Sequence, residues 1–586
     1  MTTRNSAPSS QRRRPRRGGL VAGVLLLALS ACARPAWQRA PHDRLFQRAE
    51  PARLHAEPRE IEASDWWESI YNGSFHQFAE LASPGHHAQR AFGYEVALDV
   101  NAFGQVPDSS WFENRIGRAA LPLWQVRRGP NQSEGPAAGP LIVKSGKADG
   151  VTPGLVVKDS AGDGWIVKFD PPAYPELSSA AEVISTRLLY AAGYHVPENY
   201  VVRFRLDRLA LSPKATIEDD YGREVPFSSS RLRHMLALLN PEPDGRVRAM
   251  FSKYLPGKPI GPFPLRGTRL DDPNDRIPHE RRRSLRGLWL FYAWLNNTDA
   301  KMPNSLDVFV ESDGAPAGHG YVKHFLLDFG TSLGASPNGP KAMTEGFEYV
   351  IDWERVLGRL FTAGIEYPYW VVAKRTPLRS VGQFESRVFD PAKWRPMHPN
   401  ASFERADARD TFWAAAILAR FDAVTVATAV SAGEYSEPAA SAWVLYTLME
   451  RRDKLLRHAF RDFAPLDAPR IEGKDRLRLV DLEVLAGLRG SDELRYAWRL
   501  VWHRLGTAEG VAAGSSRRPE AALGAARDAL VTRFGAATLL EAPFFSLEMR
   551  RALPAAELEP LPRTDVHLRL LGDGRWIAVG ADHVPR

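Results

Sequence analysis

The sequence predicts an α+β protein whose central part folds as two lobes, a β-rich amino lobe followed by a helical carboxy lobe. Three observations predict this class. The composition is that of an ordinary globular protein, with 44% hydrophobic and 25% charged residues among 586. Short β-prone runs separated by turn residues dominate residues 140–256, whereas apolar residues recur at helical spacing through much of residues 257–465. We expect ligands in the cleft between two such lobes.

The amino terminus predicts an export signal. Six arginines precede Gly18, no acidic residue precedes Cys32, and residues 18–31 form an apolar run. A membrane-spanning helix takes about 20 apolar residues, so this shorter run fits the apolar region of a signal peptide. Its end, Leu29-Ser30-Ala31-Cys32, resembles the lipobox of bacterial lipoprotein precursors, which implies cleavage before Cys32 and lipidation of its thiol. The alternative is an ordinary signal peptide with an incidental cysteine.

The lipobox resemblance implies a location in the bacterial cell envelope. Residues 1–31 are then a lipoprotein signal peptide and residues 32–65 a tether, with the membrane as a partner through the lipid on Cys32. Ala33 after the cysteine, rather than an aspartate, implies sorting to the outer membrane. Cys32 is the single cysteine, which excludes an internal disulfide and a cysteine-based zinc site. The leader arginines account for six of the eight excess positive charges, so nucleic acid is not expected as a partner.

The predicted amino lobe begins after an irregular extension over residues 66–139. Residues 155–159 and 165–169 are β-prone and flank a Gly/Asp-rich turn, which predicts a hairpin. Residues 178–192 have helical spacing, and Gly193 and Pro197 then end the helix. Two further β-prone runs complete the lobe, at residues 200–204 and 250–255.

The predicted carboxy lobe begins with a helix over residues 285–295. Arg281, Arg282, Arg283 and Arg286 open this helix, and we expect them on a solvated face. A hairpin is predicted over residues 306–310 and 321–327, and helices over 411–421 and 439–463. Residues 466–586 predict a small, mostly β domain, with strands at 477–480 and 496–502 and a hairpin over 567–579.

Several polar residues of the central part suit phosphate transfer from a nucleotide. That chemistry needs a cation on the phosphates, carboxylate or amide oxygens for Mg²⁺, and a carboxylate near the acceptor hydroxyl. Asp299 lies five residues before Asn304, ahead of the second hairpin, and Asp328 follows that hairpin. Asn304 and Asp328 could therefore share a metal ion, which leaves Asp299 for the hydroxyl. Lys168 lies in an apolar strand and needs an anionic partner, which Glu182 on the following helix could supply.

The order of these residues resembles the protein-kinase-like superfamily. The sequence around Asn297-Thr298-Asp299-Ala300 is most similar to the atypical branch of this superfamily, the HipA-type serine/threonine kinases and phosphatidylinositol kinases. The resemblance covers about residues 140–465 and implies ATP with Mg²⁺ or Mn²⁺ as cofactors. It implies Asp299 as the catalytic base, Asn304 and Asp328 as metal ligands, Lys168 on the α- and β-phosphates, and Glu182 as its ion-pair partner. The loop that covers the nucleotide phosphates (the phosphate cover) is then Gly150-Val151-Thr152-Pro153-Gly154. The alternative is that these residues form a plain turn.

The departures from the kinase pattern keep three functions open. No arginine precedes Asp299, because Asn297-Thr298 stands there, and no G-x-G-x-x-G precedes Lys168. The first hypothesis is transfer of phosphate to a hydroxyl of an unknown protein, lipid or sugar acceptor. The second is an inactive kinase-like scaffold, which the scarcity of ATP outside the cytoplasm favours. The third is an esterase with Ser332 as nucleophile, because residues 330–334 satisfy G-x-S-x-G, although Pro337 and Pro340 disfavour the helix that this motif requires.

Overall fold

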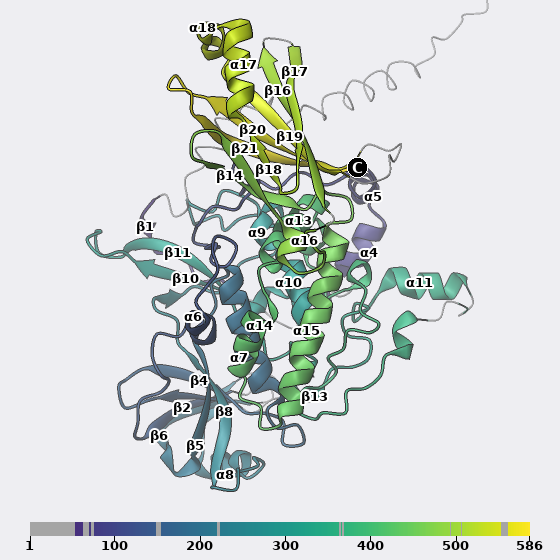
Figure 1. Ribbon diagram of the computed structural model, residues 1–586. Coiled ribbons are helices and arrows are strands. Elements are labelled where there is room, and N and C mark those ends of the chain that lie inside the picture. The colour runs from purple at the N-terminus through teal and green to yellow at the C-terminus, as the bar shows by residue number, and fades with distance from the viewer. Residues whose placement is uncertain are drawn as a thin grey trace, which may run out of the picture. The chain divides into compact units, whose positions relative to one another are not determined.

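The computed structural model describes residues 53–62, 70–71, 75–147, 154–219, 223–362, 365, 368–492, 494–504, 507–552 and 561–586. All of these belong to the second of the two units into which the chain divides, Met1–Phe46 and Gln47–Arg586. The predicted signal peptide, Cys32, Gly150 and Thr152 lie outside the described residues. The described residues form a mixed α+β structure with several sheets, as the sequence predicts (Figure 1). The two-lobe arrangement and the domain boundaries stay predictions.

A seven-stranded sheet forms from the predicted amino lobe. Its order is β5-β8-β4-β3-β2-β6-β7, and all neighbours are antiparallel except β2 and β6. The bounds are β2 Leu141–Lys147, β3 Gly154–Lys158, β4 Gly164–Lys168, β5 Asn199–Arg205, β6 Leu209–Glu218, β7 Glu224–Pro226 and β8 Arg246–Lys253. The predicted first hairpin is confirmed as β3–β4. Its turn is closed by Asp159, which accepts the backbone N–H groups of Ala161 and Asp163, both at 3.0 Å.

Helix α7 (Leu177–Ala192) connects β4 to β5 and confirms the helix predicted over residues 178–192. It ends at Gly193, whose φ of 134° favours glycine. The helix is buried on nearly all sides, including the side that carries Glu182. The reason is that α7 contacts β5 and β8 of the sheet as well as helices α6 (Leu123–Arg128) and α14 (Ala423–Ser431).

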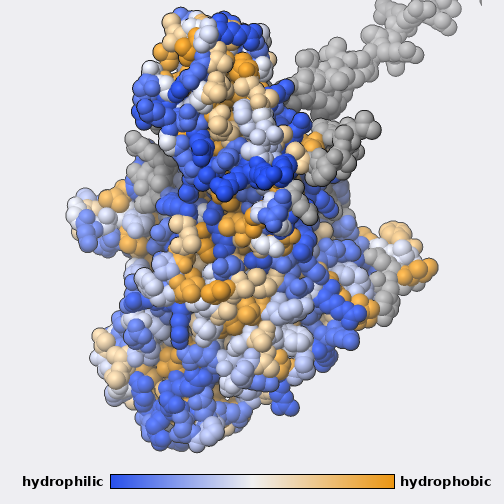
Figure 2. Space-filling view, in the orientation of Figure 1, coloured by the Kyte–Doolittle hydropathy of each residue, from blue (hydrophilic) through white to orange (hydrophobic). Residues whose placement is uncertain are grey.

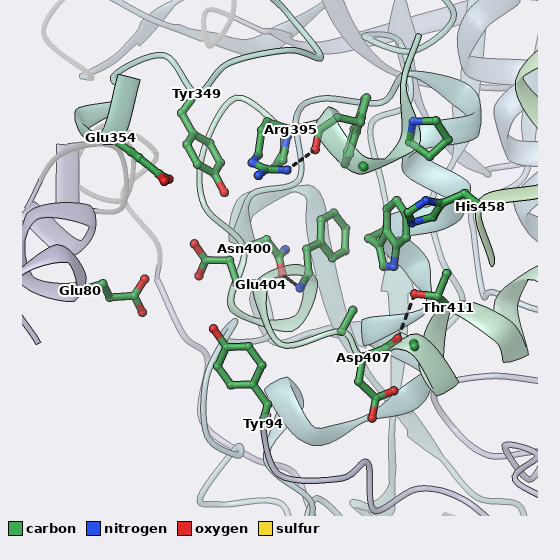
Figure 3. A pocket seen from close by; sticks show the side chains of 18 of the residues that line it. Glu80, Tyr94, Tyr349, Glu354, Arg395, Asn400, Glu404, Asp407, Thr411 and His458 are labelled. Atoms are coloured by element: carbon green, nitrogen blue, oxygen red, sulfur yellow. Dashed lines mark hydrogen bonds between the residues drawn. The ribbon is translucent and has the colours of Figure 1, made fainter. Parts of the chain in front are cut away.

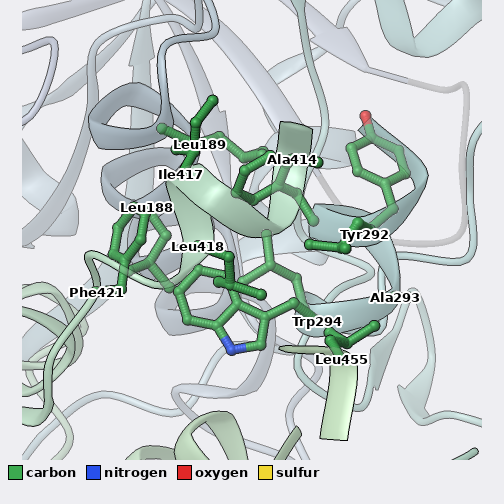
Figure 4. Close-up of a cluster of buried hydrophobic side chains, with 14 of the residues drawn as sticks. Leu188, Leu189, Tyr292, Ala293, Trp294, Ala414, Ile417, Leu418, Phe421 and Leu455 are labelled. Carbon is green, nitrogen blue, oxygen red and sulfur yellow. The ribbon is translucent and has the colours of Figure 1, made fainter. Parts of the chain in front are cut away.

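The largest apolar core lies among α7, α14 and the helices of the predicted carboxy lobe, which are α9 Arg283–Arg286, α10 Leu288–Leu295, α13 Ala408–Leu418 and α15 Pro438–Ala459. Figure 4 shows part of this core, in which the Trp294 ring lies close to Leu418 and Leu455. The helix predicted over residues 285–295 is divided at Gly287. A Cβ atom there would lie 2.7 Å from the Trp413 ring, so glycine allows α13 to approach this closely.

The predicted second hairpin is confirmed as β10 (Ser305–Glu311) and β11 (His319–Leu326), which belong to a sheet of order β1-β11-β10-β9. β1 is His55–Ala56 and β9 is Lys258–Pro259. The ladder begins with Ser305 opposite Leu326. This register brings the residues that flank the hairpin, Asn304 and Leu327, next to each other.

The part after α15 has the β character that the sequence predicts. It contains a three-stranded sheet β14-β15-β18 and a five-stranded sheet β17-β16-β19-β20-β21. The bounds are β14 Leu466–Glu472, β15 Arg476–Asp481, β16 Arg495–Arg504, β17 Thr507–Ser516, β18 Glu520–Ala522, β19 Phe544–Ala552, β20 Arg563–Leu570 and β21 Trp576–Val584. Three helices accompany them, α16 Leu482–Leu485, α17 Gly524–Phe534 and α18 Ala536–Glu541. The apolar cluster of this part includes the buried Trp502 and Trp576.

Short elements complete the described fold. The helices are α4 His76–Leu81, α5 Pro84–Phe92, α8 Ser229–Leu236, α11 Trp353–Phe361 and α12 Ala401–Glu404, and the two-residue strands β12 Ala335–Ser336 and β13 Gly339–Pro340 pair with each other. The 3-10 turns are Leu206–Arg208, His279–Arg281, Met302–Asn304, Tyr369–Val372 and Pro391–Lys393. Exposed Leu360 and Phe361 end α11, where Figure 2 shows an apolar tip. Within the described residues, no single helix is long and apolar enough to span a membrane. Helices α13 and α14 together reach that length and apolar character, but the chain bends by 78° between them.

The arginines at the start of the helical part are buried, so the prediction of a solvated face is wrong for three of them. Arg283 Nε lies 2.9 Å and Arg286 Nη1 lies 3.3 Å from the carboxylate oxygens of Asp410 in α13. Arg282 pairs with Asp275 at 2.9 Å. Helical spacing assigns arginine to the solvent side, because it carries no information about a carboxylate outside the helix, here Asp275 or Asp410, that can compensate the charge.

Candidate functional site

Lys168 is the last residue of β4, within the seven-stranded sheet. It lies opposite Gly154 of β3 on one side and opposite Met250 of β8 on the other. Gly154, the described member of the predicted phosphate cover, is therefore a direct neighbour of Lys168. Burial alone would lower the pKa of the Lys168 ammonium group, but Asp328 and Glu182 together raise it above its usual value. Lys168 is therefore charged at neutral pH.

Glu182 of α7 is the anionic partner that the sequence predicts for Lys168. Its Oε2 atom lies 3.6 Å from the Lys168 Nζ atom, and its side chain is 3% exposed. Its Oε1 atom accepts the backbone N–H of Phe329 at 3.0 Å and the side-chain amide of Asn199 at 3.2 Å. Burial raises the pKa of Glu182, and the Lys168 charge opposes this effect. Glu182 thus links β4, β5 and the chain after β11.

Asp328 follows β11 and reaches the same lysine. Its Oδ1 atom accepts a hydrogen bond from Lys168 Nζ at 2.7 Å, although 160 residues separate the two in sequence. The backbone of Asp328 is left-handed, with φ of 57°, which is uncommon for a residue with a Cβ atom. Phe329 beside it is fully buried. The buried ring and the left-handed turn together direct the carboxylate of Asp328 to Lys168.

Asn304 and Asp299 are joined to Asp328 through the backbone. The Asn304 side-chain amide donates to the Asp299 carbonyl at 2.8 Å, and the Leu327 N–H donates to the Asn304 carbonyl at 2.9 Å. The Asp299 carboxylate lies 3.6 Å from the ammonium group of Lys301. The structure therefore brings Lys168, Glu182 and Asp328 into direct contact. Asn304 is bonded to Leu327, the residue before Asp328, and Asp299 is bonded to Asn304.

Three residues that contact the site or its neighbours, Asn199, Lys301 and Lys341, are not predicted by the sequence patterns. Asn199 holds Glu182, and Lys301 pairs with Asp299. Lys341, whose side chain is fully buried, donates to the Thr298 hydroxyl and pairs with Glu345 at 2.9 Å. Lys301 lies only two residues after Asp299, so its place on the same loop was a usable signal. Nothing in the sequence indicates that Asn199 or Lys341 approaches the site.

The esterase hypothesis finds no support in the position of Ser332. The residue is fully buried, and its hydroxyl donates to the Phe329 carbonyl at 2.6 Å and lies 2.5 Å from the Ser185 hydroxyl. The two-residue strand β12 follows instead of a helix. No histidine is among the hydrogen-bond partners of Ser332 in the part of the chain that the structure describes. A nucleophile needs both access and a base.

The side chains at this site fit a nucleotide with a divalent metal ion. The Asp328 side chain is 36% exposed and offers a carboxylate oxygen. The side-chain amide nitrogen of Asn304 is hydrogen-bonded to the Asp299 carbonyl, so its amide oxygen is the atom that could bind a metal ion. Mg²⁺ prefers oxygen ligands of this kind. A Cβ atom at Gly330 would lie 3.2 Å from Glu182 Oε2, so glycine keeps this corner open. That Oε2 atom is buried and makes no hydrogen bond within the described residues, so it depends on the Lys168 charge.

Comparisons with known proteins give one distant structural likeness. No protein-family model matches the chain, and no curated protein matches it. The crystal structure of the golgi casein kinase is similar to this chain with a TM-score of 0.27 and 9% sequence identity, over 70% of this chain and 96% of that chain. A TM-score of this size does not establish a shared fold.

Proposed function

We propose that residues 140–465 form a two-lobed, kinase-like domain that transfers the γ-phosphate of ATP to a hydroxyl group of a protein, lipid or sugar. We propose further that Cys32 is lipidated and that the domain acts outside the cytoplasm, in the bacterial cell envelope. The observation that carries the enzymatic proposal is the meeting of Lys168, Glu182 and Asp328, which come from a strand, a helix and a hairpin exit. A charged lysine held by two carboxylates at this place is a ready phosphate ligand.

Each side chain has a separate role in this mechanism. Asn304 and Asp328 would hold the metal ion through their oxygens, and Lys168 would exchange its contact with Asp328 for phosphate oxygens while Glu182 keeps it in place. Asp299 would accept the proton of the attacking hydroxyl, and Lys301 would offset the charge of its carboxylate. Bound MgATP would supply the phosphoryl group and the metal charge that neutralises it during transfer.

Nucleotide binding is tested by thermal unfolding with and without ATP and Mg²⁺ or Mn²⁺. Binding stabilises the folded protein, so the unfolding temperature should rise with nucleotide concentration. Asp328→Asn is the informative variant, because asparagine tolerates the left-handed backbone but removes a metal-binding charge. The rise should disappear in this variant and persist in Asp313→Ala, an exposed aspartate at the far end of the same hairpin. If wild-type protein shows no rise with any nucleotide, the scaffold hypothesis replaces the enzymatic one.

Phosphate transfer is tested with ATP labelled at the γ-phosphate and an acceptor panel of one protein, one phospholipid and one sugar. We expect label in at least one acceptor, or in the protein itself, with wild type and Asp313→Ala. Asp299→Ala should retain the thermal shift but lose transfer, since it removes the base and not the metal ligands. Equal labelling by wild type and Asp299→Ala would remove Asp299 from the mechanism.

The membrane proposal is tested separately. Protein expressed from the full sequence in a bacterium should partition into detergent and carry acyl chains on Cys32 by mass spectrometry, whereas Cys32→Ser should partition into water. Detection of an uncleaved or unacylated Cys32 would contradict the lipoprotein hypothesis without affecting the kinase hypothesis.

A further inference from the structure

A hollow of about 550 Å³ lies apart from the Lys168 site and contains none of its residues. Helices α4 and α12, the segment before α11 and the ends of α13 and α15 contribute to its walls. Figure 3 shows Glu80, Glu404 and Tyr349 with their polar ends turned toward the same space. Nothing in the phosphate-transfer proposal uses these groups, so their arrangement needs its own explanation.

Three possible metal ligands lie close together here, and two of them, Glu80 and Glu404, line the hollow. One atom each from His76, Glu80 and Glu404 lie within 4.8 Å of one another. His76 and Glu80 are one helical turn apart on α4, which places them on the same face, and Glu404 ends α12 more than 300 residues later. An imidazole nitrogen and two carboxylate oxygens are a ligand set that suits Zn²⁺, whose bonds to nitrogen and oxygen are about 2.0–2.2 Å long.

A cation already bridges two of these ligands. The Arg266 Nη2 atom lies 2.6 Å from His76 Nε2 and 2.5 Å from Glu80 Oε1. A guanidinium group can only donate hydrogen bonds, so the nitrogen that accepts from it carries the lone pair that a metal needs. The His76 and Glu80 acceptor atoms are 3.0 Å apart and share this one positive group. Arg266 is 39% exposed and can move into solvent, which would release both acceptors.

Glu404 is the side chain that the arginine does not satisfy. The structure gives its carboxylate no hydrogen bond and no ion pair within the described residues, although the residue is partly buried and Glu80 lies close to it. Two neighbouring, partly buried carboxylates repel each other unless a positive charge compensates both. A divalent ion between them supplies that charge, and the hollow leaves room for water on the remaining coordination positions.

We propose that His76, Glu80 and Glu404 bind a divalent transition-metal ion, with Zn²⁺ as the best match, and that Arg266 holds the ligands in place until the metal displaces it. The site would tie α4, in the extension that precedes the predicted kinase-like domain, to α12. Asn400, the residue that caps the start of α12, donates its side-chain amide to the carbonyl of Ala300, directly after Asp299, at 3.1 Å. Metal binding would thus fix the segment that supports the loop of Asp299.

The test is Zn²⁺ titration of untagged, metal-free full-length protein by calorimetry, with bound metal counted after dialysis. We expect about one Zn²⁺ per chain, and an affinity at least about tenfold weaker in Glu404→Gln, because one of three ligands is lost. Glu354→Gln is the matched control, since Glu354 lines the same hollow outside the ligand set, and it should bind Zn²⁺ like wild type.

Arg266→Met distinguishes the proposed site from adventitious binding. Removing the competing guanidinium group should tighten Zn²⁺ binding, whereas a nonspecific surface site would not respond. Circular dichroism would check that the metal-free variants are folded, and substitution with Co²⁺ should give visible absorption bands that report direct coordination. The proposal is overturned if wild type retains no metal, if Glu404→Gln binds as tightly as wild type, or if Arg266→Met binds no more tightly than wild type. These outcomes do not depend on ATP, so they are independent of the proposed kinase function.

Discussion

Replacing Lys168 with methionine separates the stabilising role of this lysine from its proposed role in nucleotide binding. Methionine keeps a long apolar side chain in β4 but removes the ammonium group. Glu182 of α7, which is 3% exposed, then loses its cationic partner and stays buried. Removing one member of a buried ion pair costs about 3–5 kcal/mol. We expect the low end, about 3 kcal/mol of unfolding free energy, because the pair is separated by 3.6 Å and Lys168 itself is 24% exposed.

The contact with Asp328 adds little to this loss. Both side chains of that pair are partly exposed, and pairs of that kind contribute about 1 kcal/mol or less. The double variant Lys168→Met with Glu182→Gln should therefore recover most of the lost stability, since it also removes the uncompensated charge. Glutamine keeps the oxygen that accepts the Phe329 N–H.

The assay is urea unfolding followed by tryptophan fluorescence, combined with the MgATP thermal shift. Lys144→Met, an exposed lysine of β2 in the same sheet, is the matched control and should change stability by about 0.5 kcal/mol or less. The double variant should be stable but show no MgATP shift. The reasoning is refuted if Lys168→Met unfolds like wild type, or if Glu182→Gln restores no stability. A restored MgATP shift in the double variant would show that Lys168 is not a phosphate ligand.

Two further predictions concern Asp275 and Lys341. His279 and Arg282 hold the pKa of the buried Asp275 well below its usual range, against the effect of burial. A lowered carboxyl pKa stabilises the fold above the unfolded pKa of about 4, so Asp275→Asn should cost about 3–5 kcal/mol at pH 7. In urea titrations this difference should shrink as the pH falls below about 4; a constant difference from pH 7 to pH 3 would contradict the assignment. Lys341→Met should lower kcat of phosphate transfer with little change in KM for MgATP, because Lys341 touches Thr298 beside the proposed base and not the phosphate site. A raised KM with normal kcat would instead place Lys341 in nucleotide binding.

Local sequence patterns predict those parts of the fold that depend on turn residues and on the spacing of apolar residues. The hairpin around Asp159, the end of α7 at Gly193 and the hairpin between Asn304 and Asp328 all follow from turn residues and periodicity. Once the second hairpin is in register, its two flanking residues must lie together, so the pairing of Asn304 with the exit of β11 could be predicted. The meeting of Lys168 with Asp328 could not be predicted this way, and it was inferred from a resemblance in residue order.

Contacts between distant segments explain what the sequence did not reveal. Arg283 and Arg286 are buried because Asp410 lies across from them, and a single sequence does not show that pairing. The same holds for Glu404, which looks like an ordinary surface residue of a short helix until α4 places His76 and Glu80 against it. Charged residues have no periodicity that separates a solvated position from a compensated, buried one.

Asp328, Phe329 and Gly330, which follow the second hairpin, show why these residue types alone do not decide between an enzyme and a scaffold. Phe329 is fully buried and its N–H binds Glu182, and a Cβ atom at position 330 would lie 3.2 Å from Glu182 Oε2, a tight contact that Gly330 avoids. Both residues thus have structural reasons that hold without catalysis. Asp328 differs, because asparagine would satisfy its left-handed backbone and could still accept from Lys168. The negative charge of Asp328 pairs with Lys168 at 2.7 Å, but Glu182 also pairs with this lysine at 3.6 Å, so the lysine does not depend on Asp328 alone. The proposed metal ion would require this charge, so a normal MgATP response in Asp328→Asn would leave the proposed function without its physical basis.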